Sequence, residues 1–273
     1  MKKLVIVFTA CALVLSSMAF GQVSTPSRAF DAKRETLGPH FAGHNIVAIA
    51  YALEHSPYLK DKSQFESTAA YQARLAKFTE HTIAGGLMPS GELGFVLRDK
   101  DLSDGGYSFT YAADEGVASL SITSPIQAAE TRQHLRDYVA GNAFNAKVRV
   151  SEWVHDLYIL ESSKNGIVHV NMKMSPAEAR SLKESGRLLV VCHLIAPWIL
   201  SDSSYMEPTI DSPVELTVRK HVLQVEIDQV WVFDQRTGRI IQKRESSDLS
   251  GMCDYDVLGS DGNKIGSRYV PCK

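Results

Sequence analysis

Hydrophobic residues recur along this chain at helical spacing first and at strand spacing afterwards. Within residues 41–54 the apolar positions follow an i, i+3, i+4, i+7 pattern at Ile46, Ile49, Ala50 and Leu53. A second stripe has the same character, with Tyr71, Leu75 and Phe78. Ser67 or Thr68 can cap that second helix by accepting a hydrogen bond from a free amide in its first turn. Both stretches are therefore predicted to be amphipathic helices.

From Gly91 onwards the period of the pattern changes to two, which is typical of half-buried strands. The first alternating segments are Leu93–Leu97, Tyr107–Tyr111, Ala118–Ile122, Val148–Val150, Tyr158–Leu160 and Val168–Met174. A continuous apolar run from Leu188 predicts a buried strand. Further strands are expected at 214–218 and from Leu223 into the Val-Trp-Val-Phe-Asp segment, followed by a hairpin turn at Gly238, where a positive φ costs little.

Two helix starts interrupt the strands. Ser124-Pro125-Ile126-Gln127 has the form of a capping box with proline at the first helical position, and it predicts a helix through about Val139. Ser175-Pro176-Ala177-Glu178 carries the same signals, and the helix it predicts ends at Gly186.

Short strands joined by tight turns favour antiparallel pairing. We therefore expect an α+β protein with mainly antiparallel sheet(s) flanked by two or three helices. Residues 22–90 are expected to form an N-terminal helical segment packed on the sheet, and residues 91–273 a β-rich body that ends in a C-terminal hairpin.

The N-terminus has the form of a secretory signal peptide. Lys2 and Lys3 precede an apolar run from Leu4 to Leu15, and small residues precede a cleavage site near Gly21/Gln22. The run is shorter than the roughly 20 residues that span a bilayer. Residues 1–21 are thus predicted to be removed, leaving a periplasmic or secreted protein. Lipid modification at Cys11 is the alternative that remains open.

Charge gives little indication of a partner. The chain has 29 basic and 31 acidic residues, and removal of Lys2 and Lys3 would leave 27 basic residues. This mildly acidic balance provides no basic footprint for nucleic acid and no polybasic attraction to anionic lipid. No later segment reaches transmembrane length, so no integral membrane segment is expected in the mature chain. The partner is expected to be an unknown envelope protein or a small ligand.

Three cysteines follow the predicted cleavage site: Cys192, Cys253 and Cys272. An exported chain meets an oxidising compartment, where disulfides form. The Asp261-Gly262-Asn263 turn lies midway between Cys253 and Cys272, so folding this segment into a hairpin predicts a disulfide between them. Cys192 lies in an apolar run and is predicted to be an inert, buried thiol, since strand neighbours such as His193 point to the opposite face.

The common catalytic motifs are absent from the sequence. It contains no phosphate-binding P-loop, no G-x-G-x-x-G, no G-x-S-x-G nucleophile elbow and no H-E-x-x-H zinc motif. No cofactor is predicted. The sequence does not decide whether the protein is an enzyme, but the absence of these motifs argues against catalysis.

Weaker constellations have structural explanations. His40 and His44 have a spacing that suits zinc but no third ligand nearby. The acidic tail around Asp254 and Asp256 fails the calcium-loop spacing. Glu226 and Asp228 share one strand face and are expected to face solvent. Tyr138, Asn142 and Phe144 gather around Gly141 just before a strand, and we take them as the candidate binding loop.

Several segments resemble elements of uncharacterised exported bacterial proteins. The matching segments are FESTAAYQARL, YVAGNAFNAKVRV and MSPAEARSLKESGRLLVVCHLIAPWI. In that group an F-E-x-T-x-x-Y-x-x-R helix precedes a Y-x-G-x-N-A-F-G segment, and here Asn145 stands where glycine is usual. The resemblance covers much of residues 60–245. It implies a bacterial envelope protein and carries no activity with it.

The functional expectation is an exported bacterial envelope protein with a non-catalytic binding or structural role. One alternative is a hydrolase-like enzyme with an unrecognised site, using His193 or His169 with Asp156. The other is a secreted effector or inhibitor that docks through the aromatic strand Tyr107–Tyr111.

Overall fold

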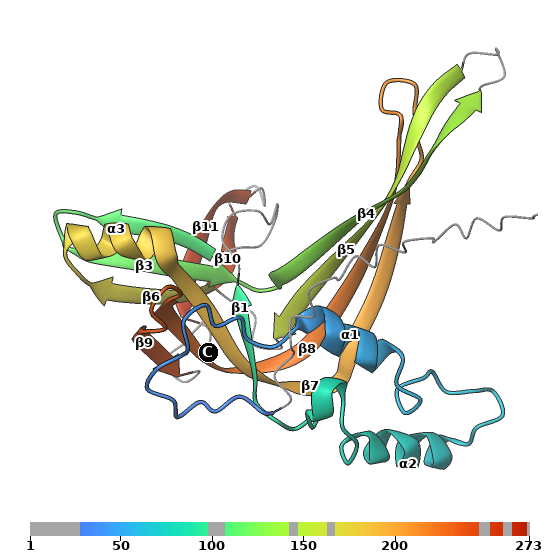
Figure 1. Cartoon of the computed structure of the whole chain (residues 1–273), viewed down its shortest axis with the longest axis horizontal. Coiled ribbons are helices and arrows are strands. Elements are labelled where there is room, and N and C mark those ends of the chain that lie inside the picture. Colours follow the sequence, from blue (N-terminus) through green and yellow to red (C-terminus); the bar gives the residue numbers. More distant parts are fainter. Residues whose placement is uncertain are drawn as a thin grey trace, which may run out of the picture.

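The chain forms two β-sheets and three α-helices in the parts that the computed structural model describes. These are residues 28–97, 107–141, 147–162 and 167–245, together with the backbone of 252–258 and 264–271. The expected α+β class is confirmed at this level, although sheet dominates the molecule (Figure 1). No helix among the described residues is long and apolar enough to cross a membrane.

The first sheet has the strand order β1-β7-β8-β5-β4, with β9 paired to β8. Its strands are β1 (Leu93–Leu97), β4 (Ile126–Gly141), β5 (Lys147–Ser162), β7 (Gly186–Met206), β8 (Val214–Asp234) and β9 (Ile240–Glu245). The segments expected at 214–218 and from Leu223 are one continuous strand. The Gly238 turn is confirmed, with φ of 74° between β8 and β9.

The second sheet has the order β11-β10-β6-β3-β2. Its strands are β2 (Tyr107–Ala112), β3 (Val117–Thr123), β6 (Ile167–Lys173), β10 (Met252–Leu258) and β11 (Lys264–Pro271). All of its pairings are antiparallel.

The first sheet departs from antiparallel pairing at one place. Strands β5 and β8 run parallel, in a register that joins Ser151 to Val214 and Ser162 to Val225. Turn signals in the sequence relate only strands that follow one another along the chain. They cannot predict this pairing, because β6, α3 and β7 separate the two strands in sequence. The first sheet is therefore mixed.

The three helices lie in the segments where local signals predict them, although α1 begins at Ile46 and covers only the later part of the 41–54 segment. In α1 (Ile46–Glu54) the whole predicted apolar stripe is buried. Ser67 caps α2 (Thr68–Phe78) and accepts a hydrogen bond from the Ala70 amide. Ser175 and Glu178 form the predicted capping box of α3 (Pro176–Ser185), which ends at Gly186. A short 3₁₀ turn, η1, covers Ala84–Gly86.

The helix predicted from Ser124 to Val139 is wrong, because residues 126–141 form strand β4. A capping-box signal is local, and this segment has no apolar stripe at helical spacing to support it. Its backbone instead pairs with β5 from Ile126↔Leu160 to Gly141↔Lys147. Buried Ile126 and Ala128 join the core at the inner end of the strand.

The main core draws side chains from both sheets and all three helices. A smaller core lies on the opposite face of β7 and β8, around Trp231 and Phe233, where Phe30 and Leu37 of the N-terminal segment cover them. Alternate residues of β7 serve the two cores: Leu188 and Val190 face the first, Leu189 and Val191 the second. The inner half of β7 is therefore buried on both faces.

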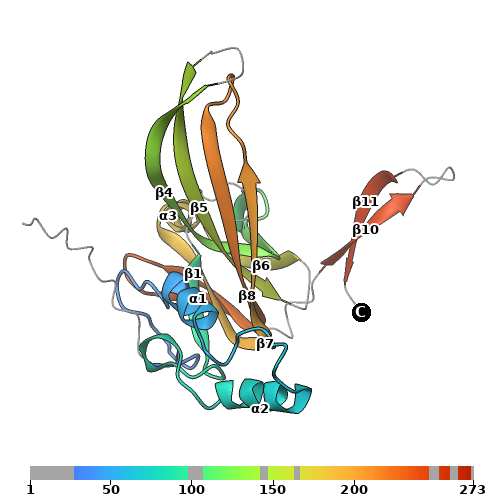
Figure 2. The ribbon, with the colours of Figure 1, turned by 90° about the vertical axis from the view of Figure 1, so that its right-hand side faces the viewer.

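The outer halves of four strands leave this core and rise away from it (Figures 1 and 2). We call them the arm, defined as residues 131–141 of β4, 147–156 of β5, 199–206 of β7 and 214–221 of β8. Nearly all of the β4 and β7 positions in the arm are exposed. The arm is thus a four-stranded sheet carried on a packed body.

Candidate functional site

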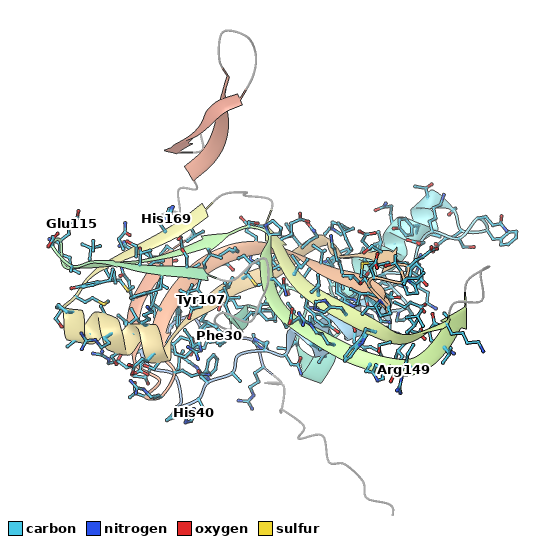
Figure 3. The ribbon with its side chains drawn as sticks, turned by 90° about the horizontal axis from the view of Figure 1, so that it is seen from above. Phe30, His40, Tyr107, Glu115, Arg149 and His169 are labelled. Carbon is cyan, nitrogen blue, oxygen red and sulfur yellow. The ribbon has the colours of Figure 1, made fainter. Side chains whose placement is uncertain are left out.

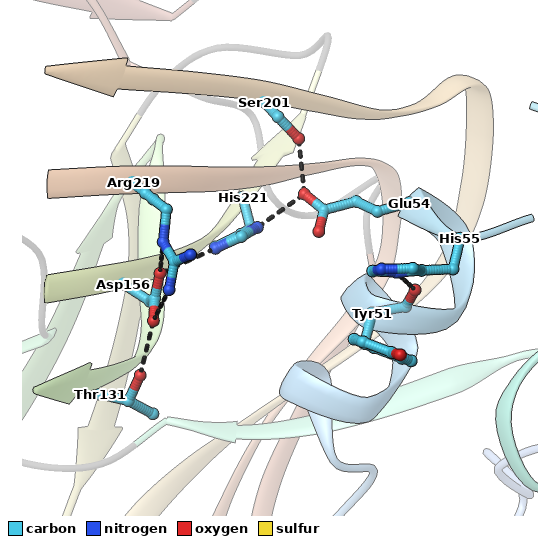
Figure 4. A network of polar contacts seen from close by, with 8 residues as sticks. All are labelled: Tyr51, Glu54, His55, Thr131, Asp156, Ser201, Arg219 and His221. Atoms are coloured by element: carbon cyan, nitrogen blue, oxygen red, sulfur yellow. Dashed lines mark hydrogen bonds and ion pairs between the residues drawn. The ribbon is translucent and has the colours of Figure 1, made fainter. Parts of the chain in front are cut away.

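A cluster of polar side chains lies at the base of the arm, where α1 meets the sheet (Figure 4). His221 of β8 lies between two carboxylates: its Nδ1 is 2.6 Å from Glu54 Oε1 and its Nε2 is 3.3 Å from Asp156 Oδ1. Ser201 of β7 donates to the same Glu54 oxygen at 2.6 Å. Glu54 comes from the last turn of α1, so the cluster joins the helix to three strands.

Asp156 is held on its other side by Arg219. The guanidinium donates through Nε to Oδ1 at 2.5 Å and through Nη2 to Oδ2 at 3.0 Å, the bidentate geometry that carboxylates prefer. Burial raises the pKa of Asp156, but the hydrogen bonds from Arg219 and His221 outweigh it and hold that pKa below its ordinary value. Asp156 is therefore an anion at neutral pH, and no proton is available from it.

An aromatic ring packs against the histidine of this cluster. The Tyr158 ring stacks on His221 with the ring centroids 4.8 Å apart. Beside it, a shallow hollow of about 450 Å³ is lined by Glu54, Ser201, Asp202, Ser203, Arg219, Lys220 and His221. Each acid and base of the network already has a partner within the chain. The arrangement fits a polar clasp between α1 and the sheet better than a reactive centre.

A second polar group lies farther out on the same face of the arm. Glu215 of β8 accepts hydrogen bonds from the hydroxyls of Tyr138 and Tyr205. The bond to Glu215 raises the pKa of Tyr205 to about 12, and the two tyrosine bonds lower the pKa of Glu215. Arg136 lies over the Tyr138 ring at 5.3 Å and pairs with Glu152.

The candidate binding loop is only partly described. Tyr138 lies within β4 and bonds to Glu215 across the sheet, so it is a strand residue of the arm. Asn142 and Phe144 lie outside the described residues, and their part in the loop stays a prediction.

The residues suggested for a hydrolase-like site are not brought together. His193 lies at the inner half of β7 and contacts Asp228 at 3.0 Å and Glu226 at 3.4 Å. His169 lies on β6 in the second sheet (Figure 3). Asp156 pairs instead with Arg219 and His221. The alternation in the sequence places Arg219 and His221 on one strand face, but nothing local links that face to Asp156 or to Glu54.

His44 has a structural role. Its Nδ1 accepts a hydrogen bond from the Gly94 amide at 2.9 Å, and its Nε2 donates to the Arg28 carbonyl at 3.1 Å. Both ring nitrogens are therefore occupied by backbone groups, while His40 is exposed with φ of 55°. Among the described residues no three His, Cys, Asp or Glu side chains gather closely enough to hold a metal ion.

Two cysteine predictions have different outcomes. Cys192 is completely buried, which confirms the predicted burial, and burial raises the pKa of its thiol. The C-terminal hairpin also forms, with Val270 opposite Cys253 in the pairing of β10 and β11. The Cys253 side chain and Cys272 lie outside the described residues, so the disulfide stays a prediction.

The three aromatic side chains of strand β2 face the main core. Tyr107, Phe109 and Tyr111 are half-buried and pack against the main core. The Tyr107 hydroxyl donates to the Gly186 carbonyl at 3.0 Å, and the Tyr111 hydroxyl to the Met174 carbonyl at 3.2 Å. These contacts give no support to docking through these rings.

Three residues of the F-E-x-T-x-x-Y-x-x-R segment are joined through Arg74. Arg74 pairs with Glu66 at 2.8 Å and lies over the Tyr71 ring at 5.1 Å. Its Nη1 also donates to the Tyr58 carbonyl at 2.7 Å. This spacing therefore fastens α2 to the loop that precedes it.

Comparison with known proteins gives no relative. No protein-family model, no curated protein and no solved structure matches this chain.

Proposed function

We propose that this chain is an exported bacterial envelope protein that acts by non-catalytic binding through its arm. The observation that best supports this proposal is that the arm leaves the packed body and exposes large apolar side chains. Those with the greatest exposure are Val139 (67%), Tyr205 (57%), Met206 (49%), Leu200 (48%) and Leu135 (46%). Large exposed apolar side chains grouped on one element are a mark of interaction surfaces.

The polar chemistry of the molecule supports binding in preference to catalysis. The clusters around His221 and Glu215 consist of groups that already bond to one another. A general acid or base needs a free position next to a substrate. Internally satisfied clusters instead stiffen a sheet that extends beyond its core, as a binding arm requires.

The envelope location rests on the sequence. Residues 1–21 have the order of a signal peptide, with a basic start, an apolar run and small residues before Gln22. The partner is accordingly expected to be an envelope component.

Site-specific photo-crosslinking in the producing bacterium tests this proposal. A benzophenone amino acid is placed at Val139 or Met206 on the arm, and at Tyr51 on α1 as a control of similar exposure (63%). We expect discrete cross-linked products in the envelope fraction from the two arm positions and none from Tyr51. The absence of products from both arm positions, or equal products from all three, would overturn the proposal.

A further inference from the structure

The arm has two long edges, and they differ in how they are protected. In the order β7-β8-β5-β4, the outer edges are β4 on one side and β7 on the other. Strand β1 pairs with β7 only as far as Cys192. Within the described part of the chain, Ile199–Met206 pairs with β8 alone.

The β4 edge carries the features that prevent strand addition. Its register with β5 shifts between Gln127 and Ala129 and again between His134 and Arg136. Charged side chains lie along it, including exposed Arg132 and Arg136. Bulges and charges are the usual means by which proteins block an edge.

The register of the β7 edge has no such shift beyond Ile199. From Ile199↔Leu223 to Met206↔Leu216 its register with β8 is continuous. The Ser203 amide donates to the side chain of its neighbour Asp202 at 2.9 Å. This amide points away from β8, and its partner in the described part of the chain is the exposed Asp202 carboxylate.

An apolar groove of about 690 Å³ lies where this edge begins. It runs between α2 and β7, and its apolar lining includes Tyr71, Leu75, Trp198 and Leu200. Trp198 packs edge-on against buried Phe78 with the centroids 5.0 Å apart, which fixes one wall. Leu200 is 48% exposed and belongs to both the groove and the edge.

The edge segment is acidic. Between Ser201 and Ser212 the sequence has Asp202, Glu207 and Asp211 and no Lys, Arg or His. Asp61 adds a carboxylate to the lining of the groove, but Lys60 and Lys62 flank it in the sequence and offset its charge. Lys220 lies opposite Asp202 on β8 and offsets one further charge. The excess of negative charge therefore lies along residues 201–212, and it favours a basic partner.

We propose that the β7 edge binds an extended, basic peptide segment of a partner protein as an added strand, with one apolar side chain held in the groove between α2 and β7. A row of backbone donors and acceptors is complementary to another backbone, so strand addition supplies affinity while the groove and the charges supply specificity. This inference rests on the proposed binding function and specifies its surface and partner.

Synthetic peptides test this directly. The probes are fluorescent nine-residue peptides in which Lys alternates with Val, ending in Leu, Phe or Trp. Two control sets replace every Lys by Glu, or N-methylate alternate backbone amides, which removes the donors that strand pairing needs. Fluorescence anisotropy with the mature protein is expected to show saturable binding of at least one Lys peptide. The Glu and N-methyl forms are expected to bind at least tenfold more weakly.

Matched protein variants locate the site. Ser203→Pro removes the outward amide, a change that edge strands tolerate, and Asp202→Lys reverses a charge; each is expected to weaken binding at least tenfold. Leu200→Ser is expected to weaken it about threefold to tenfold. Asp114→Lys in the exposed β2–β3 turn and Met88→Ser outside the arm, with Met88 38% exposed, make comparable chemical changes elsewhere and are expected to have no effect. Circular dichroism checks that each variant is folded.

The inference is overturned if no Lys peptide binds at 1 mM, if the N-methyl peptide binds equally well, or if both Asp202→Lys and Ser203→Pro bind normally while folded. A concentration-dependent dimer that Ser203→Pro abolishes would assign the edge to a second copy of the chain, and it also overturns the inference. Photo-crosslinking from Val139 that persists after any of these results would leave the arm as a binding element and reject only its β7 edge.

Discussion

At the scale of single residues, a few positions have requirements that no other residue type meets. Gly238 in the turn between β8 and β9 has φ of 74°, and a Cβ there would collide with the Leu37 carbonyl. Both the backbone conformation and the close approach of the N-terminal segment require glycine. The sequence indicates the first requirement, whereas the second arises only from the fold.

The substitution Gly238→Ala is therefore expected to destabilise the protein by about 2–4 kcal/mol, since strain and a backbone clash combine. Gly38→Ala is the matched control, because a Cβ at Gly38 meets nothing within 4 Å. Urea denaturation of both variants measures the difference. Equal midpoints for the two would contradict the account of this turn.

His44 has a requirement of a different kind, because its ring joins two backbone segments in the neutral form. Burial lowers its pKa below the ordinary value. A histidine with a lowered folded-state pKa contributes its full stability above its unfolded pKa of about 6.5 and loses that contribution as the pH falls below it. The folded protein is thus expected to lose stability on mild acidification.

His44→Asn removes this titration, so the loss of thermal stability between pH 7.5 and pH 5.0 should be smaller in the variant than in the natural chain. His40→Asn makes the same substitution at an exposed ring and serves as the matched control. Melting temperatures measured across that pH range test this prediction. Parallel curves for the natural chain and His44→Asn would rule out the proposed linkage.

At the scale of elements, local signals succeed for helices and fail for β4. The capping serines, the apolar stripe of α1 and the ending of α3 at Gly186 all belong to their own segments. Strand β4 is decided by pairing with β5, and the capping-box signal at Ser124 is overruled by it. The clasp around His221 likewise depends on α1, β5, β7 and β8 meeting at one place.

Removing Arg219 should loosen that clasp. Arg219→Met leaves the Asp156 carboxylate, whose side chain is only 13% exposed, without its bidentate partner. The expected cost is about 1–2 kcal/mol at pH 7, reduced from the value for a fully buried pair because the Arg219 side chain is 50% exposed.

The control for this change is Arg149→Met, since Arg149 is 77% exposed in its contact with Asp137. Solvent screens this ion pair, so its removal should cost less than the removal of Arg219. The pKa of Asp156 is lowered in the folded state, so the pair contributes above the unfolded pKa of about 3.9. The difference between Arg219→Met and the natural chain should therefore shrink as the pH falls through this value. A difference that grows in acid would contradict the role of Asp156.

At the scale of the whole molecule, the predicted disulfide depends on the predicted export, because disulfides persist in oxidising compartments. A chain cleaved near Gln22 retains Cys192, Cys253 and Cys272, and of these Cys192 is buried and free. An oxidising compartment permits a bridge between the two C-terminal cysteines, which would close the hairpin of β10 and β11.

Thiol counting on the exported protein under denaturing conditions should give one free thiol, with a mature N-terminus at Gln22 by mass spectrometry. The thiol count should rise to three after reduction. Three thiols before reduction would rule out the disulfide, and an intact Met1 in the envelope fraction would rule out the cleavage.

The amino-acid sequence by itself determined the features that depend on neighbours along the chain. These are the three helices with the serine caps of α2 and α3, the alternation of most strands, the Gly238 turn and the burial of Cys192. Only the tertiary structure decided the parallel pairing of β5 with β8, the strand character of β4, the clasp around His221 and the open β7 edge. The physical reason is that helix caps and tight turns are satisfied within a few residues. A strand, in contrast, acquires its hydrogen bonds from partners far away in sequence, and the same pairing decides which polar groups meet and which edge stays open.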